Sequence, residues 1–202
     1  MRIDNFNLIE EFIKRKTSID EFYFLQIYKR RKDNPEMEKD MIVIDNFFIK
    51  GADDLIKKRK RIVEICINNN ARAYIRLNKR SFKKVALQTL RLVAENIANE
   101  QYDIKNCYLL ACGQYHSDNN KTWVVDLDKS PQITEELFNF QVDNVINMIN
   151  RCEPLGEKLK LIVPTKNGLH LITNPFNIQQ LTTDCSSAVD IHKDNPTILF
   201  SA

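Results

Sequence analysis

The sequence predicts an α+β protein in which mixed or antiparallel strands are flanked by helices. Three observations predict this class. Strand, helix, strand and helix patterns alternate from Met41 to Glu100, as one open α/β unit would require. Apolar runs at 107–113 and 121–128 flank the turn-forming residues 117–120, which favours a β-hairpin. An amphipathic helix pattern then extends from Pro131 to about Asn150, with an expected buried stripe of Phe138, Val142, Val145, Ile146 and Ile149.

The first forty residues predict a helix, a strand and a basic segment. Apolar residues at helical spacing predict a helix from Asn5 to Lys16. Alternating aromatic residues favour a strand from Glu21 to Arg31. The basic cluster Lys29-Arg30-Arg31-Lys32 overlaps its end, and Asp33-Asn34-Pro35 then ends the element.

The next sixty residues supply the open α/β unit. Ile, Val and Phe residues predict a strand from Met41 to Ile49. A helix from Ala52 to Asn68 follows, with two acids in its first turn, where the helix dipole favours negative charge. A strand from Ala71 to Leu77 precedes a long helix, for which Ser81 is the expected N-cap and Glu100 the expected end. The expected buried stripe of that helix is Leu87, Leu90, Val93, Ala94 and Ile97.

Shorter elements complete the chain after the helix at 131–150. The expected segments are strands at 159–164 and 169–173, a short helix or coil at 175–181, and strands at 188–190 and 197–200. Because Gly and Pro number only 4 and 6, we expect no long disordered linker. Residues 1–40 and 41–202 are therefore expected to form one compact unit.

Composition limits the classes of protein that need consideration. Hydrophobic residues are 43% and charged residues 28% of the 202, as in ordinary globular proteins. Five widely spaced cysteines without a Cys-x-x-Cys pair argue against a disulfide framework or a zinc site, and favour a cytoplasmic location. We expect no signal peptide and no membrane partner, since no apolar run is long enough. A net charge of +3 permits a nucleic-acid partner.

The stretch from Trp123 to Asp128 carries two acids in one predicted strand. Alternate side chains of a strand point to opposite faces, so Asp126 and Asp128 share a face while Trp123, Val125 and Leu127 fill the other. Neighbouring carboxylates repel each other, and a divalent cation relieves that repulsion. Oxygen ligands suit Mg²⁺ or Mn²⁺. The stretch predicts a metal site for phosphoryl or nucleotidyl transfer; an edge strand with two exposed acids is the alternative.

A second stretch, from Pro164 to Ile172, places a lysine, a glycine and a histidine close together. Gly168 allows the backbone to approach a ligand closely or to turn tightly. His170 is a hydrogen-bond donor in either charge state, and Lys166 could meet a phosphate. The stretch therefore predicts a nucleotide-binding loop, whereas a hydrogen-bonded core histidine is the simpler alternative for His170.

The order of these motifs resembles the archaeo-eukaryotic primase superfamily, which includes primase-polymerases of phages and plasmids and the polymerase domain of bacterial end-joining ligases. The matching residues, within roughly residues 41–202, are Val124 to Asp128, Asn167 to His170, and Val189-Asp190, with Asp194 as the rival third acid. The resemblance implies a two-lobed core with an RRM-like sheet. It also implies two divalent metals, Mg²⁺ or Mn²⁺, on Asp126, Asp128 and Asp190, and an incoming nucleotide held partly by His170.

The resemblance further implies partners and leaves alternatives open. Nucleotides and a DNA or RNA template are the expected ligands, and a helicase or other replication proteins are the expected partners. Relatives are usually larger or joined to helicase or zinc modules, and this chain has no zinc-ligand set. A minimal catalytic core, a subunit that needs a partner, and an inactive nucleic-acid-binding relative are all compatible with the sequence. So is a nuclease or phosphatase that uses the same acids.

Two sets of basic residues are candidates for nucleic-acid contact. Arg76 and Arg80 follow the predicted strand at 71–77 and are candidate template or phosphate contacts. The run Lys57 to Arg61, with Lys57, Arg59 and Arg61 as the candidates, occupies a predicted helix face. Both sets are expected either to contact phosphates or to be ordinary solvated surface.

Overall fold

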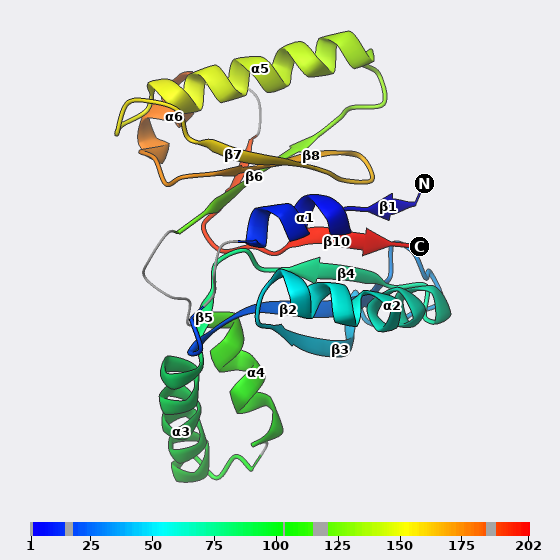
Figure 1. Cartoon of the computed structure of the whole chain (residues 1–202), viewed down its shortest axis with the longest axis vertical. Helices are drawn as coiled ribbons and strands as arrows, with labels where there is room; N and C mark the ends of the chain where they lie inside the picture. Colours follow the sequence, from blue (N-terminus) through cyan, green and yellow to red (C-terminus); the bar gives the residue numbers. More distant parts are fainter. Residues whose placement is uncertain (1, 15–17, 103, 115–120, 185–188) are drawn as a thin grey trace.

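The protein is built from two antiparallel sheets, and helices pack against both of them (Figure 1). The structure is a computed structural model that describes residues 2–14, 18–102, 104–114, 121–184 and 189–202. The expected turn at 117–120, together with Arg15, Lys16, Cys185 and Ala188, lies outside the described residues. The α+β class is confirmed, with antiparallel pairing in both sheets.

The first sheet joins strands from both ends of the chain. Its order is β1-β10-β4-β2-β3, with the short β5 also paired to β2. The strands are β1 (Ile3–Asp4), β2 (Glu21–Arg30), β3 (Met41–Ile49), β4 (Arg72–Ile75), β5 (Arg80–Ser81) and β10 (Thr197–Ser201). The expected open α/β unit at 41–100 is wrong in one respect. β3 and β4 do not pair with each other, because β2 lies between them and is antiparallel to both.

One face of this sheet is covered by helices α1 (Phe6–Ile13) and α2 (Ala52–Asn68). Their apolar stripes are buried, with Ile9, Leu55 and Ile62 each 0% exposed. The bounds predicted for β3 and α2 are confirmed residue for residue, and α1 lies within its predicted range. The reason is that the apolar residues of these segments recur with a clear period of two or 3.6 residues, and tertiary packing agrees with that period.

The aromatic end of the opposite face is covered by helices α3 (Phe82–Ala98) and α4 (Lys105–Gln114). The predicted strand at 107–113, and with it the hairpin, is therefore wrong. Cys107 and Ala111 are buried at a spacing of four residues, and Cys112 is buried beside them. The run is helical because this spacing lets α4 bury one face against Phe22 and Phe24 of β2.

Helix α3 begins where the sequence predicts but buries a different face. The Ser81 hydroxyl caps it by accepting a hydrogen bond from the Lys84 backbone N–H at 3.1 Å. The predicted buried stripe is wrong, because Leu87, Leu90 and Ile97 are 59%, 66% and 50% exposed. Val85 is the α3 residue that is buried, since the helix packs through its first turns and against α4.

The second sheet carries the two-acid strand. Its order is β7-β8-β6-β9. Its strands are β6 (Trp123–Asp128), β7 (Leu159–Pro164), β8 (Gly168–Thr173) and β9 (Asp190–His192), and its helices are α5 (Glu135–Arg151) and α6 (Ile178–Asp184). The predicted stripe of α5 is confirmed, with Phe138, Val142, Val145 and Ile149 buried against Val125 and Leu171. As predicted, the odd-numbered residues of β6 face this core.

The two sheets meet where β10 lies beside the second sheet. Val124 and Ile172 share a core cluster with Ile198 of β10. The Asn5 side chain, which is 5% exposed, donates hydrogen bonds to the carbonyls of Pro164 and Ile198 at 2.9 and 3.0 Å. This buried contact fixes the polar face of the second sheet opposite the first. Among the described residues, no helix is long and apolar enough to cross a membrane.

Candidate active site

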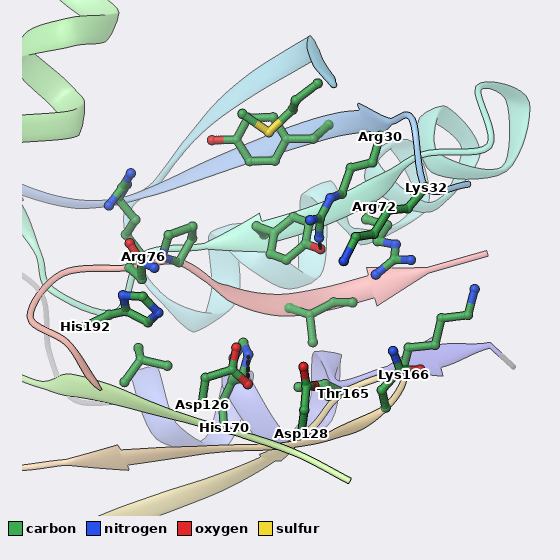
Figure 2. Close-up of a pocket in the computed structure, with 18 residues that line it drawn as sticks. Arg30, Lys32, Arg72, Arg76, Asp126, Asp128, Thr165, Lys166, His170 and His192 are labelled. Atoms are coloured by element: carbon green, nitrogen blue, oxygen red, sulfur yellow. Dashed lines mark hydrogen bonds and ion pairs between the residues drawn. The ribbon is translucent and has the colours of Figure 1, made fainter. Parts of the chain in front are cut away.

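A cleft of about 480 Å³ lies between the two sheets. One wall is the polar face of the second sheet, with Asp126, Asp128 and His170 (Figure 2). The other wall and the rim carry cationic side chains, namely Arg30, Lys32, Arg72, Arg76 and Lys166. The cleft therefore sets carboxylates against cations, an arrangement that can receive phosphates and a metal together.

The acids of β6 share one face, as the sequence predicts, and strand register places two partners beside Asp126. His170 of β8 is directly opposite Asp126 on one side, and Asp190 of β9 is directly opposite on the other. Residues paired in this way have Cβ atoms about 4.5–5.5 Å apart and point to the same face. Strand register therefore places Asp126, His170 and Asp190 side by side, with Asp128 next to them. Of the two rival candidates for the third acid, Asp190 is the one that lies beside Asp126.

The rival acid, Asp194, is held elsewhere. Its carboxylate accepts a hydrogen bond from Arg80 Nη2 at 2.6 Å and another from the Asn78 amide at 2.9 Å. Arg76 Nη1 lies 3.6 Å from the same carboxylate. Arg80 is 0% exposed, so the expectation that it contacts nucleic acid is wrong. Buried Arg80 and partly buried Asp194 instead form an ion pair that ties the segment before β10 to β5.

The electrostatics of Asp126 and His170 follow from their burial beside each other. Burial raises the pKa of Asp126 above its ordinary value; His170 and His192 oppose the rise, while Asp128 and Asp190 add to it. Burial lowers the pKa of His170, and Asp126 and Asp128 oppose that fall. His170 is therefore neutral at pH 7. Its Nε2 lies 3.4 Å from Asp126 Oδ1, and its Nδ1 lies 2.9 Å from the Thr197 hydroxyl.

Gly168 is required by a close approach between two strands. A Cβ atom at this position would lie 1.9 Å from the Leu127 carbonyl oxygen and 2.9 Å from the Asp128 Cα. The sequence predicts that Gly168 admits a ligand or a turn, and the structure shows that it admits the backbone of β6. Its effect on the site is thus to keep β8 in register, with His170 beside Asp126.

The cationic wall is organised by Asp33, in the turn between β2 and β3. Arg72 donates two hydrogen bonds to its carboxylate, at 2.6 and 2.7 Å, and Lys166 lies 3.5 Å away. Burial alone would raise the pKa of Asp33, but Arg72 and Lys166 hold it below its ordinary value. Asp33 thus joins the first sheet to the loop before Gly168 at one end of the cleft.

Arg76 lies at the other end of the cleft, on the side of His192 (Figure 2). Its Nη1 donates to the Asp194 carbonyl, while its Nε is buried with no hydrogen-bond partner among the described residues. Burial lowers the pKa of Arg76 although Asp194 opposes the fall. Arg76 therefore lines the cleft, and its role as a template or phosphate contact stays a prediction.

The basic face of α2 lies away from the cleft. Arg59 pairs with Asp4 at 3.1 Å, and Arg61 pairs with Asp45 at 3.4 Å. Lys57 is exposed on the same helix. None of these three side chains lines the cleft, so the structure does not bring them together with the acids.

Several cleft residues were missed by sequence reasoning. Arg30 and Lys32 belong to a visible basic cluster, so composition could have found them. Arg72 and His192 each stand alone within strand patterns, and no local signal distinguishes them from ordinary surface residues. Only the pairing of β2 with β4 and of β6 with β9 brings them to the cleft.

The donor set fits a hard divalent cation by its chemistry. Asp126, Asp128 and Asp190 offer carboxylate oxygens, the ligands that Mg²⁺ and Mn²⁺ prefer. The raised pKa of Asp126 reflects burial and its two acidic neighbours, a penalty that a cation would relieve. Among the described residues, no three His, Cys, Asp or Glu side chains already surround a single point.

Comparison with known proteins gives no match. No protein-family model, curated protein or solved structure matches the chain.

Proposed function

We propose that the chain is a primase/polymerase-like nucleotidyltransferase, with a two-lobed, RRM-like core of the archaeo-eukaryotic primase type. The observation that carries the proposal is the register of three adjacent strands. It aligns Asp126, His170 and Asp190 on one face, with Asp128 two residues along β6. Asp126, Asp128 and His170 line a cleft large enough for a nucleotide and face a wall of cations, while Asp190 is exposed on the strand beside Asp126.

In the proposed reaction, a 3′ hydroxyl attacks the α-phosphorus of a nucleoside triphosphate and pyrophosphate leaves. Asp126, Asp128 and Asp190 would hold Mg²⁺ or Mn²⁺. When bound, two such ions supply activation of the hydroxyl and stabilisation of the leaving pyrophosphate. The chain's own contribution is to keep the three carboxylates adjacent, which the pairing of β6 with β9 does.

His170 and Lys166 would hold the triphosphate. When the Thr197 hydroxyl donates to Nδ1 of a neutral His170, Nε2 carries the proton and can donate to a phosphate oxygen. Lys166 is 43% exposed and shares Asp33 with Arg72, so it can turn from that carboxylate towards a phosphate. Both residues flank Gly168 in the loop and strand to which the proposal assigns nucleotide binding.

The test is a primer-synthesis and primer-extension assay on DNA and RNA templates with Mg²⁺ or Mn²⁺. Wild type is expected to incorporate nucleotides, and Asp126→Asn plus Asp128→Asn to lose incorporation by at least about a hundredfold, because each carboxylate contributes metal-based stabilisation of the transition state. Asp143→Asn is the matched control, since Asp143 is exposed on α5, on the other side of the second sheet.

The outcomes separate the competing functions. Incorporation by wild type and by Asp143→Asn, but not by the double variant, supports the proposal. Metal-dependent cleavage of the oligonucleotide without incorporation indicates a nuclease on the same acids. Binding of the oligonucleotide without either reaction indicates a non-catalytic nucleic-acid-binding protein.

A further inference from the structure

A second hollow lies beside the mouth of the cleft, at the turn between β2 and β3. Its volume is about 480 Å³, and its lining residues are Arg30, Arg31, Lys32, Pro35 and Asp40. Arg30 and Lys32 also line the cleft (Figure 2). The two hollows therefore share a cationic wall that continues from the site out onto the surface of the first sheet.

The cations of this wall are only weakly neutralised. Lys32 is exposed and has no ion pair with an acid in the part of the chain that the structure describes. Arg31 pairs with Asp40 at 3.3 Å, but both side chains are largely exposed. Exposed ion pairs of this kind contribute little stabilising free energy. Arg30 donates to the Tyr74 hydroxyl at 2.9 Å instead of to a carboxylate. These charges are available to an anionic chain.

Aromatic rings lie on the same wall. Tyr74 is partly exposed in the cleft, and its ring centroid is 5.7 Å from that of Tyr28. The hydrogen bond from Arg30 fixes its hydroxyl, and the Tyr28 hydroxyl donates to Gln26. A held aromatic ring between arginines is the combination that binds single-stranded nucleic acid, because unpaired bases stack on the ring while cations follow the phosphates.

We propose that a single-stranded nucleic acid leaves the cleft across the β2–β3 turn, with its phosphates on Arg30, Arg31 and Lys32 and one base stacked on Tyr74. This path differs from the α2 face, whose Arg59 and Arg61 are paired with acids and lie outside the cleft. That the strand is a template rests on the proposed function, whereas the surface itself is tested without catalysis.

The test is fluorescence anisotropy of a labelled single-stranded oligodeoxythymidylate, measured in EDTA over a series of salt concentrations. Arg31→Ala plus Lys32→Ala is expected to lower the slope of log affinity against log salt by about 1.4, because each lost phosphate contact removes about 0.7 for a single strand. Lys57→Ala plus Arg61→Ala is the matched control, which removes the same charge from α2 and is expected to leave the slope unchanged.

A second pair of variants tests the stacked base. Tyr74→Leu is expected to weaken binding about 5- to 100-fold, the loss of one stacked base, while Tyr74→Phe keeps the ring and most of the affinity. Thermal melts establish that each variant is folded. Equal slopes for the two double variants, or equal affinity of Tyr74→Leu and wild type, would overturn the proposal.

The two proposals fail in different ways. If oligonucleotide binding depends on Lys32 and Tyr74 but no nucleotide is incorporated, the proposed binding surface is supported and the proposed catalytic function is rejected. Incorporation without such dependence keeps the catalytic function and removes this surface.

Discussion

Asp126 lies between a histidine and an acid on neighbouring strands, and its ionisation is the property on which the site depends. Burial raises its pKa, so its charged form is less favourable than that of a solvated aspartate when no cation is bound. His170 is the main group that opposes the rise, but burial outweighs it. At the scale of single residues, the site is therefore strained electrostatically in a way that metal binding would relieve.

Asp126→Asn is expected to raise the melting temperature at pH 7 in EDTA by roughly 1–3 °C, the effect of a fraction of a kcal/mol to about 1 kcal/mol. The sign follows from linkage: the folded pKa exceeds the unfolded one, so stability is lost as pH rises from the unfolded value through the folded value. This rise in melting temperature should vanish at pH values below the pKa of an aspartate in the unfolded chain. Calorimetry over about pH 3.5–7, with Asp143→Asn as the control, measures it.

With added Mg²⁺, wild type should melt at a higher temperature than Asp126→Asn. The reason is that a ligand that binds the folded state stabilises wild type by mass action. An Asp126→Asn variant that melts below wild type at pH 7 in EDTA would contradict this account of the carboxylate.

Replacement of Asp194 and replacement of Asp190 are expected to have different effects on the free energy of unfolding. Asp194→Ala should cost about 3–5 kcal/mol in the free energy of unfolding, because it leaves the charge of fully buried Arg80 without its partner. Asp190→Ala should change that free energy by less than about 0.5 kcal/mol, since Asp190 is exposed. Urea denaturation measures both. Equal costs would show that Asp194 has no structural role distinct from that of Asp190.

At the scale of elements, pattern and period predicted most of the individual helices and strands, but not how the strands pair. β3, α2 and β7 have the predicted bounds, and α5 has the predicted buried stripe. The failure at 107–113 has a physical cause. A seven-residue apolar run fits a buried strand and a buried helix equally, and packing of α4 against the phenylalanines of β2 decides it. The buried stripe predicted for α3 is wrong for a similar reason. Packing against α4 selects which face of α3 is buried, and that face does not carry the predicted stripe.

Two glycines give a matched test of element packing. Gly168→Ala is expected to destabilise the protein by several kcal/mol and to displace His170, because its Cβ would overlap the Leu127 carbonyl of the paired strand. Gly113→Ala, near the end of helix α4, places its Cβ where no atom of the described residues lies within 4 Å. It should be neutral or stabilise the protein by up to about 0.5 kcal/mol through helix propensity. Thermal melts of both variants check this, and a Gly168→Ala protein as stable as wild type would refute the packing.

At the scale of the whole molecule, the site is formed by two sheets that the sequence does not place together. Asp126, Asp128 and His170, which line one wall of the cleft, lie in stretches that the sequence alone marks as candidates. The opposite wall is marked only in part, since Arg30 belongs to a visible basic cluster but Arg72 reaches the cleft only when β2 inserts between β3 and β4. Long-range pairing of this kind leaves no local pattern, which is why Arg80 and Arg76 looked alike in sequence although one is buried and the other lines the cleft.

The central claim is that Asp126, Asp128 and Asp190 act together in nucleotide transfer. The measurement that tests it most directly is incorporation of a single labelled nucleotide onto a primer–template with Mn²⁺, by wild type, Asp190→Asn and Asp143→Asn. The account predicts incorporation by wild type and Asp143→Asn, and a loss of about a hundredfold or more in Asp190→Asn with its stability unchanged. Incorporation by Asp190→Asn at the wild-type rate would contradict it.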